Sequence, residues 1–278
     1  MTAADILRVA RDRLDPKHLT IVAVGNPKEF GGQLTALGMP VTDLDITIPE
    51  PKSQTTAAPV DPQSIAQGGA LLKQAQAAAG GLEKLTAIKD IRETRSMQFD
   101  ASAGGLKSSQ VNYFLMPSTF RQENVLPFGK VIAYSDGKSG FVHNPQMSMP
   151  LSGPLLKQIQ GEILREYVAL LLSDHASSRT VSLAGENTLR IADKDGNSVE
   201  VKLDPATGLI ATESYSQQQP SGPPSAITIA MSDYKDVDGV KMPFKMTITQ
   251  GEKKVGEATI SEYKFNSGLK AEELSKQQ

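Results

Sequence analysis

The stretch YKDVDGVKMPFKMTI, residues 234–248, contains the clearest strand pattern in the chain. Its apolar residues alternate with polar ones from Val240 to Ile248, which is the pattern of a strand with one buried and one solvated face. Asp238-Gly239, just before this run, is a typical hairpin turn sequence. The stretch therefore predicts the second strand of an antiparallel hairpin.

The same alternation recurs on both sides of this hairpin. It is found in these sets: Met97 and Phe99; Val111, Tyr113 and Leu115; Val199, Val201 and Leu203; Ile227, Ile229 and Met231. Turn sequences separate these runs at 135–137, 193–197 and 204–208. The pattern predicts an antiparallel meander with one apolar face. Pro243 predicts an edge strand or a bulge, and therefore a sheet that is not fully closed.

Two amphipathic segments can cover that apolar face. Residues 64–79 are rich in Ala and Gln and end at Gly80-Gly81, which predicts a helix. Residues 154–172 place their apolar side chains on one helical face and predict a second, continuous helix. We expect a curved antiparallel sheet, an incomplete β-barrel, covered by helices that leave room for an apolar groove.

The N-terminal part has a different pattern. Residues 3–14 predict an amphipathic helix, Leu19–Val24 a strand buried on both faces, 28–37 a helix and Val41–Ile48 a further strand. Residues 49–63 contain four prolines among Ser, Gln and Thr, typical of a linker or, alternatively, of a long surface loop. The fold class is therefore α+β, with an α/β fragment at 1–48, a linker at 49–63 and a β domain at 64–278.

Composition excludes several classes of function. The net charge of −2 and the pI near 6.0 lack the basic surface that nucleic acid requires. No apolar run approaches the ~20 residues of a membrane span. Charged residues interrupt the first twenty positions, so we expect no signal peptide there. Cysteine is absent, which excludes disulfides and thiolate chemistry.

No catalytic or metal-binding pattern emerges. His18, His143 and His175 are isolated, and neither HExxH nor HxxEH occurs. The acidic loop at 193–197 fits a hairpin turn better than a calcium loop. Glu162 and Glu166 could share a helix face, but Arg165 beside them favours a solvated, mixed-charge surface. We expect no catalytic residue, no metal and no cofactor.

The apolar strand faces are the candidate ligand-lining surface. Methionine is flexible and suits apolar surfaces that adapt to different partners. The candidates are Met97, Phe99, Tyr113, Val240, Met242, Phe244, Met246 and Ile248. The alternative is that these side chains fill an ordinary core.

Residues 1–50 resemble the C-terminal end of an insulinase/pitrilysin-type zinc peptidase domain. The resemblance rests on RVARDRLDPKHLTIVAVGNPKEF, then LTALG and VTDLDI. The catalytic zinc motif of that family has no counterpart here, so the resemblance transfers no catalytic residue. It implies that the segment is the remnant of a longer peptidase-like protein, in which case Leu19–Val24 must find a substitute strand partner.

Residues 64–278 resemble the lipoprotein-carrier-like (LolA/LolB-like) superfamily of the bacterial envelope. The matching segments are AAAGGLEKLTAIKDI, LDPATGLIATESY, YKDVDGVKMPFKMTI and EYKFNSGL. The resemblance implies a curved, incomplete barrel whose apolar interior holds acyl chains, and a periplasmic or envelope location. It defines no ligand residue by position.

Together these features predict a non-enzymatic envelope module that binds a lipid, a lipidated chain or an apolar partner segment. The alternative function is an accessory or docking region for a zinc metallopeptidase whose catalytic half, a separate domain or subunit, is not in this chain. Neither function involves nucleic acid or a transmembrane segment.

Overall fold

The computed structural model describes residues 2–13, 22, 38, 40–42, 61–101, 104–127, 129–218 and 223–277. The chain divides into two compact units, Met1–Lys52 and Ser53–Gln278. In the first unit, α1 (Ala3–Arg13) confirms the expected N-terminal helix. Thr2 caps it: its Oγ1 accepts the backbone N–H of Asp5, and the Asp5 carboxylate accepts the backbone N–H of Thr2. The strands expected at Leu19–Val24 and Val41–Ile48, the helix at 28–37 and most of the linker at 49–63 lie outside the described residues.

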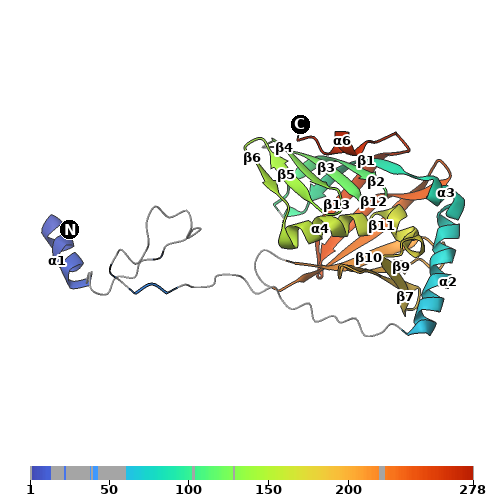
Figure 1. Cartoon of the computed structure of the whole chain (residues 1–278), viewed down its shortest axis with the longest axis horizontal. Coiled ribbons are helices and arrows are strands. Elements are labelled where there is room, and N and C mark those ends of the chain that lie inside the picture. Colours follow the sequence, from blue (N-terminus) through green and yellow to red (C-terminus); the bar gives the residue numbers. More distant parts are fainter. Residues whose placement is uncertain are drawn as a thin grey trace. The chain divides into compact units, whose positions relative to one another are not determined.

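The second unit, hereafter the β unit, is built on one antiparallel sheet (Figure 1). Its strands are β1 (Asp90–Phe99), β2 (Lys107–Leu115), β3 (Thr119–Leu126), β4 (Gly129–Ser135), β5 (Gly140–Asn144), β6 (Met147–Pro150), β7 (Arg179–Gly185), β8 (Thr188–Asp193), β9 (Ser198–Leu203), β10 (Ile210–Gln217), β11 (Ser225–Val237), β12 (Val240–Gln250) and β13 (Lys253–Phe265). Their order is β6-β5-β4-β3-β2-β1-β13-β12-β11-β10-β9-β8-β7. Neighbours in the sheet are thus neighbours in sequence, except for the β1–β13 pair.

Few helices accompany this sheet. They are α2 (Pro62–Ala79), α3 (Leu82–Ala87), α4 (Gly153–Leu164), α5 (Tyr167–Leu171) and α6 (Ala271–Leu274). Within the part of the chain that the structure describes, none of the helices is long and apolar enough to cross a membrane. The antiparallel sheet with helices is as predicted, and so is its lack of full closure: in the described order β6 and β7 are its two ends.

The sheet curves around α4. This helix contacts β3 and β4, and Arg165, at its C-terminal end, lies over the ring of Tyr215 on β10. Strands β4 and β10 are far apart in the strand order, so one helix can reach both only if the sheet bends between them. We call the face that α4 covers the inner face and the opposite one the outer face.

The expected turns are confirmed. Residues 135–137 begin the β4–β5 connection, 193–197 join β8 to β9, 204–208 join β9 to β10, and Asp238-Gly239 joins β11 to β12. In the 193–197 turn, the Asp193 carboxylate accepts the backbone N–H groups of Asp195 and Asn197. The acidic side chain therefore serves the hairpin itself.

Pro243 predicted an edge strand or a bulge. The edge-strand prediction is wrong, because β12 lies between β11 and β13, and the β11–β12 ladder has no register shift at Pro243. The β12–β13 ladder begins at the pair Lys245–Thr259, so Pro243 lies beyond it and pairs only with Tyr234 on β11. Proline lacks the N–H that a second ladder would use. The local end of one ladder is what accommodates it.

The predicted single helix at 154–172 is also wrong, because α4 ends at Leu164 and α5 begins at Tyr167. The Glu166 side chain accepts the backbone N–H of Ala169 at 2.7 Å and so caps α5. Such a cap favours a new helix start over continuation of the old one. Every residue of α5 is buried.

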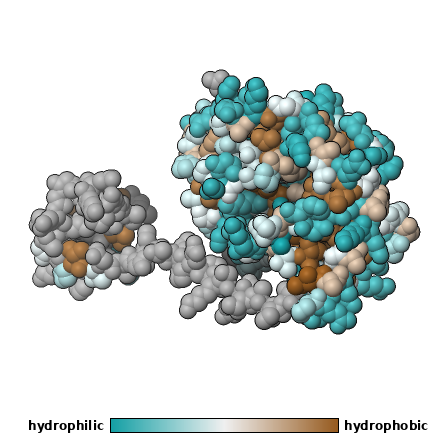
Figure 2. Space-filling view, turned by 45° about the vertical axis from the view of Figure 1, so that its right-hand side comes forward, coloured by the Kyte–Doolittle hydropathy of each residue, from teal (hydrophilic) through white to brown (hydrophobic). Residues whose placement is uncertain are grey.

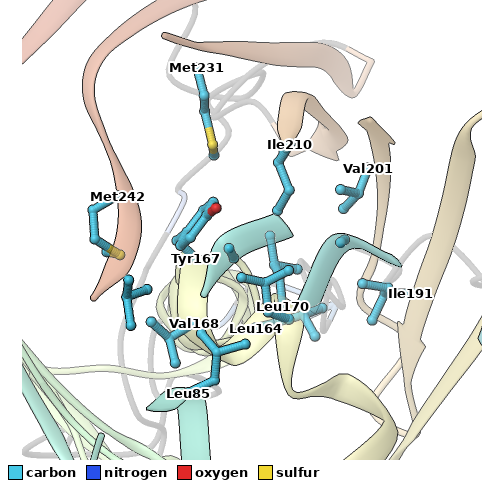
Figure 3. Packing of buried hydrophobic residues seen from close by; sticks show 14 of the residues in the cluster. Leu85, Leu164, Tyr167, Val168, Leu170, Ile191, Val201, Ile210, Met231 and Met242 are labelled. Carbon is cyan, nitrogen blue, oxygen red and sulfur yellow. The ribbon is translucent and has the colours of Figure 1, made fainter. Parts of the chain in front are cut away.

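The main apolar core lies between α2, α5 and strands β7–β10 (Figure 3). It is tightly filled: the space bounded by Leu72, Ala75, Leu170, Leu171, Leu189, Ile191, Val201, Leu203 and Ile210 has no room for a water molecule. Close packing of this kind stabilises the fold through apolar burial and dispersion. The side chains at this end of the β unit therefore form an ordinary, filled hydrophobic core.

The C-terminal segment packs on the other side of the sheet. Buried Arg121 on β3 donates hydrogen bonds to the carbonyl oxygens of Leu274 and Lys276 and pairs with Glu123. Asp90 on β1 accepts the backbone N–H groups of Ser267, Gly268 and Leu269. The sequence NSGL of the superfamily resemblance thus forms a turn that Asp90 anchors.

Candidate binding face

An apolar row crosses the inner face at the middle of the sheet. Ile229 pairs with Ile248, Ile248 with Gly256, and Gly256 with Phe99, across β11, β12, β13 and β1. Direct cross-strand partners share a face. The three large side chains of this row are only half-buried. On β10 the row continues into Glu213, the cross-strand partner of Ile229.

A methionine row lies beside the apolar row. Met231, Met246, Ala258 and Met97 are successive cross-strand partners on β11, β12, β13 and β1, and Ser108 on β2 continues the row. These side chains are buried, except Met246, which is half-buried. Figure 3 shows Met231 pointing toward Tyr167 of α5. The methionine row therefore lies between the filled core and the half-buried apolar row.

Beyond the methionine row the inner face becomes polar. On β1 and β2, Arg95 donates a hydrogen bond to Gln110 at 2.8 Å, and Asn112 donates one to Glu93 at 2.9 Å. Gln122 on β3 donates to Asn112 at 3.0 Å, and Arg95 lies 3.4 Å from Glu93. Buried polar groups need such partners, because each unpaired one costs free energy. The inner face thus has an apolar part on β11–β13 and β1, and a polar part on β1–β3.

A cluster of Glu162, Arg165, Glu213 and Tyr215, hereafter the charged cluster, lies on the inner face where α4 meets β10. The Arg165 guanidinium lies 3.7 Å from the centre of the Tyr215 ring and 2.7 Å from a Glu162 oxygen. Glu213 lies on the same strand as Tyr215, is only 3% exposed, and its Oε2 has no hydrogen-bond partner among the described residues. The cluster therefore contains a paired cation and an unpaired buried carboxyl.

Burial dominates the protonation of the carboxyls in this region. It raises the pKa of Glu213 to about 8, with the neighbouring Glu162 and Glu166 adding to the rise. It raises the pKa of Glu166 to about 7, against the opposing effect of the α5 backbone N–H groups. Charged carboxylates are poorly solvated in such surroundings, so the neutral form is favoured. Glu213 is thus largely protonated at neutral pH.

The structure distributes the eight predicted lining residues among the apolar row, the methionine row, the apolar core and the outer face. Phe99 and Ile248 belong to the apolar row, and Met97 and Met246 to the methionine row. Val240 and Met242 are fully buried in the apolar core. Phe244 is half-buried, packs against the core and meets the ring of Tyr263 edge to face.

Tyr113, the eighth predicted residue, lies on the outer face. It pairs with Arg92 on β1 and Arg121 on β3, while the alternate residues Asn112 and Phe114 point inward and are buried. The expected apolar set Val111, Tyr113 and Leu115 is therefore the outer set of β2. Only part of the predicted surface comes together, at Phe99, Ile248, Met97 and Met246.

The charged cluster corrects the prediction of a solvated surface at residues 162–166. The Arg165 side chain is only 10% exposed and Glu166 is buried, because α4 ends against β10 instead of continuing through solvent. Glu213 and Tyr215 were not predicted. Their position in strand phase with inward-facing residues of β9 and β11 is the signal that could have found them.

His143 and His175 have different surroundings in the structure. The Nδ1 atom of His143 is buried without a hydrogen-bond partner, and His175 pairs with Asp174 at 2.8 Å; His18 lies outside the described residues. In the described ranges, no three side chains of His, Cys, Asp or Glu meet in a way that could hold a metal ion.

The β unit is similar in fold to solved structures. No protein-family model matches the chain, and no curated protein matches it. A LolA superfamily protein from Nitrosomonas europaea is similar in structure, with a TM-score of 0.53 and 12% identity over 75% of this chain and 97% of that one. A DUF1329 family protein from Desulfovibrio piger has a TM-score of 0.50 and 15% identity over 74% of this chain and 98% of that one.

These likenesses show that the β unit has a LolA-like fold. They agree with the resemblance to the lipoprotein-carrier-like superfamily seen in residues 64–278. None of the comparisons supports the resemblance of residues 1–50 to an insulinase-type peptidase.

Proposed function

We propose that the β unit is a non-catalytic module of the bacterial envelope that binds the acyl chain of a lipid or of a lipidated protein. The observation that carries the proposal is the half-buried apolar row of Phe99, Ile248, Gly256 and Ile229 on the inner face. It lies beside a core that is already filled, so further packing within the core does not require it.

The gain in binding comes from removing apolar surface from water. Each buried methylene group contributes about 0.8 kcal/mol, so contact along a dozen methylenes offsets the ordering costs of binding. The neighbouring methionines allow the surface to fit chains of different shape, since Met side chains adapt their rotamers readily. The LolA-like fold and the superfamily resemblance support an acyl chain as the occupant and an envelope location.

Apolar side chains also reach the outside of the β unit. Met147 and Met149 on the end strand β6 and Leu155 on α4 are exposed. Figure 2 shows hydrophobic residues in brown among hydrophilic ones on the surface of the β unit. Single exposed apolar residues are common on soluble proteins. The proposal therefore rests on the continuous inner row.

Ile248→Lys tests this assignment. We expect at least a ten-fold loss of affinity for a fluorescent fatty acid, because a lysine ammonium in the apolar row must be desolvated when the chain binds. The matched control is Thr247→Lys. Thr247 is the next residue along β12 and pairs with Glu257 on the outer face, so affinity should change less than two-fold.

Both affinities are measured by titrating the probe fluorescence, with circular dichroism confirming that both variants are folded. Equal affinities for the two variants would contradict the assignment of the inner face. Absence of probe binding to the unmodified protein at micromolar concentration would contradict the proposed function as a whole.

A further inference from the structure

The charged cluster at the end of α4 has the composition of a cation-binding site. Its parts are the face of Tyr215, the carboxylate of Glu162 and the buried carboxyl of Glu213. Aromatic faces together with carboxylates are the usual protein surroundings of ammonium groups. In this structure the protein's own Arg165 guanidinium occupies the position.

The charged groups around Glu213 could be balanced by one additional cation. The groups that face it are Arg165 and Glu162 from α4, Glu166 from the α4–α5 junction, Arg95 from β1, and the phenols of Tyr215 on β10 and Tyr234 on β11. Glu213 is largely protonated in the unbound protein, and its ionisation next to a bound cation would leave three carboxylates facing two guanidinium groups. Arg165 is already paired with Glu162, and Oε2 of Glu213 has no hydrogen-bond partner among the described residues.

The same carboxyl adjoins the proposed acyl-chain surface. Glu213 is the direct cross-strand partner of Ile229, which begins the apolar row. A ligand with its chain along that row would therefore bring its head to Glu213 and Tyr215. An isolated cation would contact only the charged cluster, whereas an amphiphile would contact both the charged cluster and the apolar row.

We propose that this cluster recognises the ammonium headgroup of an amphiphilic ligand, which replaces Arg165 over Tyr215 and pairs with Glu213. The inference rests on the proposed function and specifies its ligand class: an acyl chain attached to a positively charged nitrogen. Arg165 acts as an internal competitor, and its displacement couples headgroup binding to release of the end of α4 from β10.

The local structure around Gly161 gives a way to disturb Arg165 alone. A Cβ atom at Gly161 would lie 2.6 Å from Nη1 of Arg165, the far end of a flexible side chain. Alanine at this position would therefore move the Arg165 guanidinium from its position over Tyr215. Alanine itself favours a helix more than glycine does.

The test compares two lysolipids with the same fourteen-carbon acyl chain, one with a phosphocholine and one with a phosphoglycerol headgroup. Each displaces a fluorescent fatty acid from the full chain below its micelle concentration. We expect the choline lysolipid to bind at least ten-fold more tightly. Glu213→Gln should reduce that ratio to about one, and Gly161→Ala should increase it several-fold.

Glu200→Gln is the matched control. Glu200 lies on neighbouring β9, its side chain is 45% exposed and pairs with Arg190, so the lysolipid ratio should stay that of the unmodified protein. Equal affinity of the two lysolipids for the unmodified protein would overturn the inference and leave the proposed function standing. So would a choline preference that persists in Glu213→Gln or fails to grow in Gly161→Ala. If neither lysolipid nor the probe binds, the proposed function itself fails.

Discussion

At pH 9, we expect Glu213→Gln to raise the free energy of unfolding by about 5 kcal/mol, and at pH 5 to change it by less than about 1 kcal/mol. Burial raises the pKa of Glu213 in the folded protein to about 8 from its ordinary value of 4.5. Between these two values the folded state keeps a proton that the unfolded state has lost. The stability of the unmodified protein therefore falls as the pH rises through this window and levels off above it.

Glutamine removes that dependence because it matches the protonated carboxyl in size and never ionises. Urea unfolding at pH 5, 7 and 9 measures the difference. Part of the pH dependence should survive in the variant, because burial also raises the pKa of Glu166 to about 7. The exposed control Glu200→Gln should follow the unmodified protein at every pH. Parallel pH profiles for the unmodified protein and Glu213→Gln would show that Glu213 is not a buried, proton-retaining group.

The second large effect is expected at adjacent glycines of α2. A Cβ atom at Gly68 would lie 2.5 Å from the backbone carbon of Ser182 on β7, whereas one at Gly69 would meet nothing within 4 Å. Gly68→Ala should lower the free energy of unfolding by about 3 kcal/mol, because backbone cannot yield without separating α2 from the sheet. Gly69→Ala should raise it by up to about 1 kcal/mol, since alanine favours the helix interior.

Thermal and urea unfolding of both variants measure this pair of opposite shifts. The adjacent position controls for helix propensity, so the difference between the two variants isolates the contact with β7. If Gly68→Ala were as stable as Gly69→Ala, the packing of α2 on the end strand would be other than described.

Sequence periodicity predicted most of the β unit. Strands such as β9 and β12 alternate cleanly, and turns such as Asp238-Gly239 have strong local preferences, so local rules suffice. Local rules failed where tertiary contacts decide the outcome. Pro243 fits an interior strand because one ladder ends beside it, and Glu166 divides the predicted helix by capping α5.

The candidate binding face was harder to predict than the fold. Alternation marks which residues share a face, but it does not show which face is covered. On β2 the more apolar set, Val111, Tyr113 and Leu115, points outward, while Gln110 and Asn112 are buried within a hydrogen-bonded polar network. The partners of these two amides lie on other strands and could not be paired from sequence. The mixed charges of Glu162, Arg165 and Glu166 predicted a solvated helix surface, although the Arg165 side chain is only 10% exposed and Glu166 is buried.

The central claim, that an acyl chain lies along the apolar row of the inner face, is tested most directly by tryptophan quenching. The chain contains no tryptophan, so a single introduced one reports on its own surroundings. Phe99→Trp places it in the apolar row, and Tyr113→Trp places it at a similarly half-buried position on the outer face. A fatty acid brominated along its chain quenches indole fluorescence only at close contact. The account predicts saturable quenching in Phe99→Trp and none in Tyr113→Trp; equal quenching of the two variants, or quenching of Tyr113→Trp alone, would contradict it.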